Sequence, residues 1–260
     1  MQVSAVSLAW PRMEWPFVSQ WCRHLANHGV ERVILGQHDR PAQVWDKRPN
    51  PAYYHPLLRD HEIKERWRDA IDKCRLHLKV DIHRIPSHWT QMGPMQSRLF
   101  RYARRRAIDA DVDWVLSCDM DEFPIPAQGE TLVEFVTDLG KRRPNVAAAH
   151  FRQLVFESRW DIWNEFAPRD LSSPCAYHPR VIRLHKYLYR PGLARPLNAH
   201  RAAPIESGAN IINMPATRIL LHHFRGIESA NHRQLGSIQT LPNRTADPLA
   251  PVPFVRSPAT

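Results

Sequence analysis

Three carboxylates stand together in the middle of the sequence, directly after an apolar run. Residues 114–116 (Trp-Val-Leu) lead into Asp119, Asp121 and Glu122. Carboxylates this close repel one another and raise each other's pKa. A divalent cation removes that conflict, because hard carboxylate oxygens suit Mg²⁺ or Mn²⁺. Side chains alternate along an extended segment, so Asp119 and Asp121 would share one side and one ion could reach both. The spacing therefore predicts a metal site.

The competing interpretation of these acids is a solvated acidic turn after a strand. Two features favour the metal site. The acids directly follow a run that is typical of a buried strand, and they interrupt a basic chain of 36 Lys and Arg against 26 Asp and Glu, with a net charge of +10. That positive balance implies an anionic partner, which is a nucleotide phosphate, a nucleic acid or an anionic membrane surface.

Apolar periodicity predicts the elements that position the acids. Residues spaced as on one helix face alternate with short apolar or alternating runs that indicate strands. This alternation is typical of a largely parallel sheet covered on both faces by helices, and the fold class is therefore α/β. The expected order is strand 3–8, helix 14–28 capped by Gly29, strand 30–35, helix 62–78, strand 80–85, helix 94–110 and the strand that ends at Asp119.

In such sheets ligands bind outside the carboxyl ends of the strands. Asp119 and Asp121 lie at such an end, so their position predicts a site independently of their chemistry. The second half of the sequence has a mixed pattern, which we interpret as a platform that completes a cleft. Its expected elements are a helix over 131–141 and strands over 146–156, 179–188 and 217–224.

Other features bound the class of protein. The four cysteines are scattered with no C-x-x-C pair, which favours reduced thiols. The N-terminus lacks the basic region of a signal peptide, and no run has the length of a membrane span. We therefore expect a cytoplasmic protein whose membrane contact, if it has one, is peripheral and at the anionic inner face. Residues 241–260 form a proline-rich tail.

Three segments resemble glycosyltransferases of the GT-A fold, and among them the family 2-like enzymes related to glycosyltransferase family 92. Residues 119–123, Asp-Met-Asp-Glu-Phe, match the Asp-x-Asp-Glu-Phe motif of that group at every fixed position. Residues 14–39 are similar to its opening, which has an acid, an apolar helix that ends near His, a Gly-Val pair and a strand. Residues 221–229 resemble its late His-aromatic segment. The similarity spans most of residues 3–235.

The resemblance implies one GT-A-like catalytic domain over residues 1–240, in which the mostly parallel, Rossmann-like sheet is flanked by helices. Residues 1–123 would form the nucleotide-binding half, and residues 124–240 would complete the metal and acceptor side. The implied activity is a metal-dependent transfer of a sugar from a nucleotide-sugar donor, with a UDP-sugar preferred, to a glycan or another hydroxyl acceptor.

The resemblance also assigns roles around a bound Mn²⁺ or Mg²⁺. Asp121 would contact the metal directly, whereas Asp119 would contact it through water or hold the ribose. His222 or His223 would be a third ligand, although an ordinary polar role for either histidine is an equal alternative. Alternation along a strand would send only one of the two inward.

Further residues would complete the reaction site. Arg225 would grip the diphosphate, because a guanidinium binds phosphate oxygens in a bidentate way. Asp39 would contact the base or ribose, or would instead cap a turn. The resemblance favours an inverting transfer, which needs a carboxylate base, and either Asp161 or Glu157 is expected in that role.

Two other functional classes compete with this one. A metal-dependent nuclease or phosphohydrolase would also use two acids and basic surroundings, but the sequence names no further acids that would converge on the pair. A non-enzymatic nucleic-acid-binding module would explain the positive charge. The basic residues of this protein are spread along the chain and form no familiar nucleic-acid motif, so nucleic acid is not the expected partner.

Overall fold

Most of the first half of the chain alternates between strands and helices. The computed structural model describes residues 1–15, 18–39, 59–86, 92–126, 129–158, 176–177, 182–226 and 239–240. Up to the acidic motif the elements are β1 (Val3–Ala9), α1 (Pro11–Glu14), α2 (Val18–Asn27), β2 (Arg32–His38), α3 (Asp60–Arg75), β3 (Lys79–Ile85), α4 (Met92–Asp109) and β4 (Trp114–Ser117).

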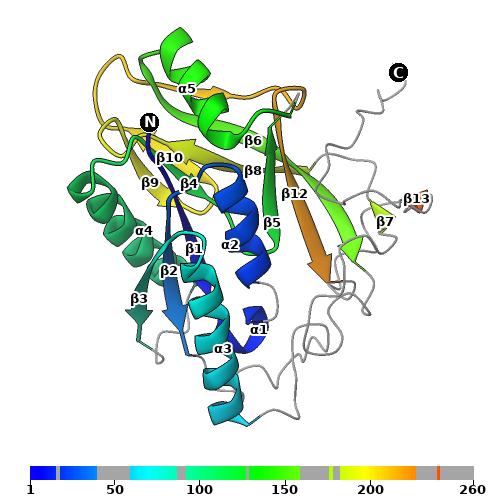
Figure 1. The fold of residues 1–260 in the computed structure, drawn as a ribbon. Coiled ribbons are helices and arrows are strands. Elements are labelled where there is room, and N and C mark those ends of the chain that lie inside the picture. The colour runs from blue at the N-terminus through cyan, green and yellow to red at the C-terminus, as the bar shows by residue number, and fades with distance from the viewer. Residues whose placement is uncertain are drawn as a thin grey trace.

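The first four strands form a parallel block. They lie in the order β3-β2-β1-β4, and Val6 at the middle of β1 pairs with Ile34 of β2 on one side and Ser117 of β4 on the other. Parallel pairing brings the carboxyl ends of these strands to one edge of the sheet. The predicted α/β class, with a mixed and mostly parallel Rossmann-like sheet flanked by helices, is confirmed (Figure 1).

The second half extends this sheet with mixed pairing. β8 pairs antiparallel with both β4 and β6, while β12 pairs parallel with β6 and antiparallel with β5. The remaining elements are β5 (Glu122–Pro126), α5 (Leu132–Arg142), β6 (Val146–Ser158), β7 (Ala176–Tyr177), β8 (Ile182–Tyr189), β9 (Ala194–Asn198), β10 (Arg201–Pro204), β11 (Asn210–Asn213), β12 (Ile219–Gly226) and β13 (Gln239–Thr240).

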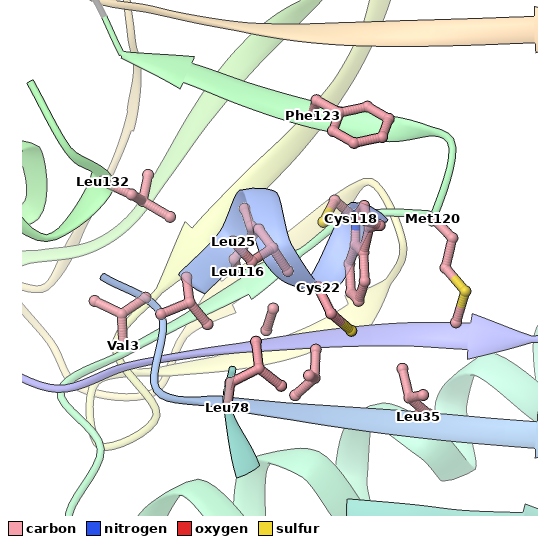
Figure 2. Packing of buried hydrophobic residues seen from close by; sticks show 14 of the residues in the cluster. Val3, Cys22, Leu25, Leu35, Leu78, Leu116, Cys118, Met120, Phe123 and Leu132 are labelled. Atoms are coloured by element: carbon pink, nitrogen blue, oxygen red, sulfur yellow. The ribbon is translucent and has the colours of Figure 1, made fainter. Parts of the chain in front are cut away.

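Helices pack on both faces of the sheet. One apolar cluster joins the sheet to α2, α3 and α5, and Figure 2 shows Cys22 and Leu25 of α2 within it, between β1 and β5. A second cluster joins the opposite face to α4 through Leu99 and Ala103. β1 contributes side chains to both clusters, because its side chains alternate between the two faces of the sheet. Val3 belongs to the first cluster and Val6 to the second.

Local sequence signals explain where α2 ends and where α5 begins. Gly29 closes α2 with a φ of 81°, in the left-handed region, and a Cβ there would lie 2.6 Å from Val133 Cγ2. Only glycine meets both demands, so the predicted cap is confirmed. At α5, Thr131 Oγ1 accepts from the Glu134 backbone N–H, and the Glu134 carboxylate accepts from the Thr131 N–H. This capping box fixes the start of the helix.

The structure divides one expected helix and adds strands that were not expected, among them β5 at the acidic motif. The helix expected over 14–28 is divided, because α1 ends at Glu14 and α2 begins only at Val18, with Pro16 in the sequence between them. β5 was not predicted, and it contains Pro124 and Pro126, which disfavour a strand. Among the described strands β5 pairs only with β12, and prolines are tolerated on such an edge strand.

Three further observations bear on the sequence expectations. Cys22, Cys74 and Cys118 are buried free thiols. In the part of the chain that is described, no helix combines the length and the apolar character needed to span a bilayer. The tail expected over 241–260 lies outside the described residues.

Candidate functional site

The acidic motif leaves the end of β4 with an alternating pattern of burial. Cys118 and Met120 are 2% and 0% exposed and face the core, whereas Asp119 and Asp121 are partly exposed. Figure 2 shows Cys118 and Met120 among the buried side chains around α2. Both acids are thus exposed in part, although Met120 and Asp121 form a turn rather than the extended segment that the Asp-x-Asp spacing predicts.

Glu122 holds the turn that follows β4. Its side chain is only 1% exposed, and its Oε2 accepts a 2.6 Å hydrogen bond from the backbone N–H of Asp119. The Asp119 carbonyl in turn accepts from the Glu122 N–H at 3.1 Å. These two bonds close a tight loop across residues 119–122, so the third acid of the motif stabilises the backbone that presents the other two.

Lys186 supplies a buried cation to this loop. Its Nζ donates to Asp119 Oδ2 at 2.6 Å and lies 3.2 Å from Glu122 Oε2, while its side chain is 1% exposed. Burial alone would lower the pKa of Lys186, but the carboxylates of Asp119 and Glu122 outweigh it and the pKa is raised. The lysine is therefore held in its charged form, and it neutralises part of the repulsion among the acids.

The sheet topology brings Lys186 to the motif. β8 runs antiparallel beside β4 with Tyr187 opposite Ser117, so the preceding residue of β8 comes level with the start of the acidic loop. Tyr187 is itself fully buried, and its hydroxyl donates to the Asn198 carbonyl at 2.7 Å. Residues 119 and 186 are thus joined by strand pairing across 67 positions of sequence.

A fourth carboxyl group lies near the acids. Glu14 ends α1, directly beyond the carboxyl end of β1, and its Oε2 accepts from the Trp10 backbone N–H at 2.7 Å. Burial is the main cause that raises the pKa of Glu14 well above its usual value. The charges of Asp121 and Asp119 raise it further, although the Trp10 hydrogen bond opposes them. Glu14 therefore takes up a proton more readily than an ordinary glutamate.

Asp39 lies at the same edge of the sheet, beyond the carboxyl end of β2. Two strand spacings separate β2 from β4, which is about 10 Å. Gln37 Nε2 donates to both carboxylate oxygens of Asp39, at 3.0 and 3.2 Å, and Gln37 Oε1 accepts from Trp67 Nε1 of α3. The exposed Asp39 carboxylate is thus oriented by Gln37, which Trp67 of the helix layer holds in turn.

The predicted histidines lie beside the motif in the sheet. In the antiparallel pairing of β12 with β5, His223 lies opposite Glu122 and His222 opposite Phe123. Arg225 and Glu157 are opposite each other in the pairing of β12 with β6. The backbone therefore places His222, His223 and Arg225 on β12, the strand that pairs with β5, and Glu157 one strand further from the acidic loop on β6, while Asp161 lies outside the described residues.

The donor set at the motif fits a divalent cation in part. Among the residues whose side chains are described, no three His, Cys, Asp or Glu groups are arranged to hold a metal ion. Asp119 and Asp121 nevertheless offer the chemistry that Mg²⁺ and Mn²⁺ take, because such ions are often held by one or two carboxylates and complete their shell with water and substrate phosphates. A site of this kind needs only the two acids that the motif presents outward.

Reasoning from the sequence assigned no role to Lys186 or Glu14, although both lie at the motif. Lys186 directly precedes the segment Tyr187-Leu188-Tyr189, and this was the only signal that it is buried, since Arg183 lies on the same strand and Arg190 follows it. Glu14 belongs to the opening segment of the resemblance, yet its place beside Asp121 depends on the β1–β4 pairing.

Comparisons with known proteins give a likeness to solved structures at low identity. No family profile and no curated protein sequence matches the chain. A UDP-glucose pyrophosphorylase from Acinetobacter baumannii superposes with a TM-score of 0.37 and 12% identity, over 74% of this chain and 76% of that one. TarS from S. aureus gives a TM-score of 0.40 and 13% identity, over 86% of this chain and 37% of TarS.

A third similar structure is core-mannan synthase A from Aspergillus fumigatus in a Mn/GDP form. It gives a TM-score of 0.32 and 9% identity, over 60% of this chain and 43% of that one. At TM-scores this low the likeness carries no role to any residue of this chain. The functional interpretation therefore depends on the motif and on the geometry around it.

Proposed function

We propose that this protein is a GT-A-type glycosyltransferase that moves a sugar from a nucleotide-sugar donor to a hydroxyl acceptor. The observation that carries the proposal is the outward pair Asp119 and Asp121 at the carboxyl end of β4, the edge where parallel sheets of this class bind ligands. The resemblance of residues 119–123 to the Asp-x-Asp-Glu-Phe motif supports the same class.

The donor would lie along the edge formed by β2, β1 and β4. Asp39 stands at the β2 end of this edge, in a position suited to the ribose or base, and Asp119 and Asp121 stand at the β4 end, in a position suited to the diphosphate side. The span of about 10 Å between β2 and β4 is the scale of a nucleoside diphosphate. A UDP-sugar is the donor that we propose, with Arg225 as a second contact for its phosphates.

A divalent Mn²⁺ or Mg²⁺ held by Asp121, with Asp119 beside it, would offset the charge that develops on the leaving diphosphate. His223 is our choice for a further ligand. Its backbone is in register with Glu122 of the acidic loop, whereas the backbone of His222 is in register with the buried Phe123.

The transfer itself is an inverting displacement. The acceptor hydroxyl oxygen forms a bond to the anomeric carbon while the bond from that carbon to the diphosphate oxygen breaks. The hydroxyl proton passes to a carboxylate base, and the nucleoside diphosphate leaves with the electron pair of the broken bond. Asp161 or Glu157 is the proposed base, and Glu157 lies on β6 in register with Arg225.

Calorimetric titration of UDP into the protein tests the proposal, once with Mn²⁺ and once with EDTA. We expect binding that depends on the metal. GDP and ADP titrated in the same way would identify a different donor nucleotide. Absence of binding for all three nucleotides in the presence of metal would overturn the transferase proposal, and salt-sensitive binding of single-stranded nucleic acid without metal would replace it by a nucleic-acid-binding role.

A further inference from the structure

The acidic loop has its own internal cation. Three carboxylates, Asp119, Asp121 and Glu122, are crowded within four positions, and the ammonium of Lys186 contacts two of them, at 2.6 and 3.2 Å. Lys186 and Glu122 are both 1% exposed, whereas the Asp119 side chain is 47% exposed. The lysine thus stands behind the loop, away from solvent, and the acids stand between it and any ligand.

This arrangement fixes the charge that a ligand meets. The three carboxylates and one ammonium together leave two negative charges, which is the charge that one divalent cation neutralises. Glu14 adds a carboxyl group nearby whose pKa is raised by burial. Glu14 is present in every variant considered below, so it does not contribute to the differences between them. Because Lys186 is enclosed, water screens its field at the loop less than it screens an exposed lysine.

We propose that Lys186 is a positioning residue that tunes the acidic loop for a metal bound together with a nucleoside diphosphate rather than for the metal alone. The inference rests on the proposed function and deepens it by assigning a residue that sets how the metal and the nucleotide share the site. Lys186 acts through Asp119 and contacts no ligand itself, because its side chain is buried.

The physical argument predicts opposite effects on the two ligands. A fixed positive charge behind the loop repels a bare divalent cation and attracts an anionic diphosphate. Removal of Lys186 therefore tightens binding of free Mn²⁺ and weakens binding of UDP to the metal-loaded site. Removal of a negative charge at Glu122 does the reverse. Structural damage to the loop would weaken binding of Mn²⁺ and of UDP together. Opposite changes in the two dissociation constants therefore indicate an electrostatic role of Lys186, and parallel changes indicate a structural one.

Four proteins form a charge series for the experiment. Lys186→Met leaves three negative charges at the loop, wild type leaves two, and Glu122→Gln leaves one. The double variant Lys186→Met/Glu122→Gln returns to two without the buried ion pair. The substituted glutamine side chain keeps an oxygen that can accept the Asp119 N–H, so the 119–122 loop can stay closed. Lys186→Arg keeps the charge and is the conservative control.

Free Mn²⁺ binding is measured by electron paramagnetic resonance without nucleotide, and UDP binding by calorimetry at saturating Mn²⁺. For each unit of charge we expect a shift of about tenfold in each dissociation constant, in opposite directions for the two ligands. Wild type, Lys186→Arg and the double variant should agree within about threefold. Circular dichroism confirms that each variant is folded.

The outcomes separate this inference from the proposed function. Lys186→Met leaves Glu122 as a buried charge without its ammonium partner, so this variant can fail to fold. In that case Glu122→Gln, which should shift both dissociation constants in the other direction, tests the role of Lys186. If wild type binds Mn²⁺ and UDP, but each variant weakens both ligands or changes neither, the tuning role of Lys186 is overturned and the transferase proposal stands. If wild type binds neither, both proposals fall together.

Discussion

The indole nitrogen of Trp21 donates a 3.0 Å hydrogen bond to the carbonyl oxygen of Glu122, across 101 positions of sequence. One turn further along α2, His24 Nε2 lies 3.0 Å from the Pro124 carbonyl oxygen. The two carbonyls are two residues apart on β5 and therefore point the same way, toward the edge of β5 that is not paired with β12. α2 covers this open edge and thereby fixes the strand that leaves the acidic loop.

Trp21→Phe tests how much the loop depends on this cover. Phenylalanine keeps most of the buried ring but leaves the Glu122 carbonyl without its donor, which should lower the free energy of unfolding by about 1–3 kcal/mol. Urea denaturation measures the loss. Trp67→Phe is the matched control, because it removes an indole bond to the partly buried Gln37 side chain, where water can take its place. Equal losses in both variants would mean that the Trp21 bond has no special weight.

Asp121→Asn tests the assignment of the metal. The amide is a poorer metal ligand than the carboxylate. Loss of a residue that only hydrogen-bonds to a metal ligand lowers affinity roughly 10–100-fold, so we expect the metal-dependent affinity for UDP to fall by more than that. Asp121 is partly exposed, and the change should leave the melting temperature nearly unaltered. Asp69→Asn, on the exposed face of α3, is the control. Unchanged UDP affinity in Asp121→Asn would remove this residue from the site.

The two histidines of β12 are separable by register. His223 lies opposite Glu122 and His222 opposite Phe123, which is fully buried in the cluster around α2. We therefore expect His223→Ala to weaken Mn²⁺-dependent UDP binding by about tenfold or more without lowering the melting temperature. His222→Ala should lower the melting temperature and leave UDP binding unchanged. Calorimetry and thermal unfolding of the two single variants give the comparison. Mild and equal effects on binding would exclude a histidine ligand on this strand.

Periodicity was sufficient to predict the parallel half of the fold. β1, β3, α3 and α4 lie where apolar spacing placed them, within about three residues at each end, because each buries a regular face against the sheet. β5 was missed for a physical reason. Its two prolines oppose strand formation locally, and only the pairing with β12, a strand far later in the sequence, makes the strand.

The candidate site shows the same limit more sharply. Asp119 and Asp121 are visible in the sequence, because an acidic pair after an apolar run is a local pattern. Lys186 is not, because it reaches Asp119 only through the antiparallel β4–β8 pairing, and no local spacing encodes which strands become neighbours. The partners that set the charge of a site come from the tertiary structure, whereas the residues that face a ligand can be read from a motif.

His28 predicts a pH dependence of stability. It lies at the end of α2, with its ring 4.4 Å from that of His24, and burial lowers its pKa below the usual value. Between the lowered pKa and about 6.5, the unfolded chain binds a proton that the folded protein does not, so stability rises with pH through this window. His83, whose pKa is lowered by burial and by Arg98, acts with the same sign.

Glu14, whose pKa is raised, acts with the opposite sign in the wild type and in the variants alike. We therefore expect the melting temperature of the wild type to change less favourably than that of His28→Gln, which cannot take up the proton, as the pH drops from about 7.5 to about 5. Thermal unfolding across that range measures both curves. His77→Gln, an exposed histidine near the end of α3, is the control and should follow the wild-type curve. If the His28→Gln and wild-type curves run parallel, burial of His28 has no effect on its proton, and the pH dependence belongs to other groups.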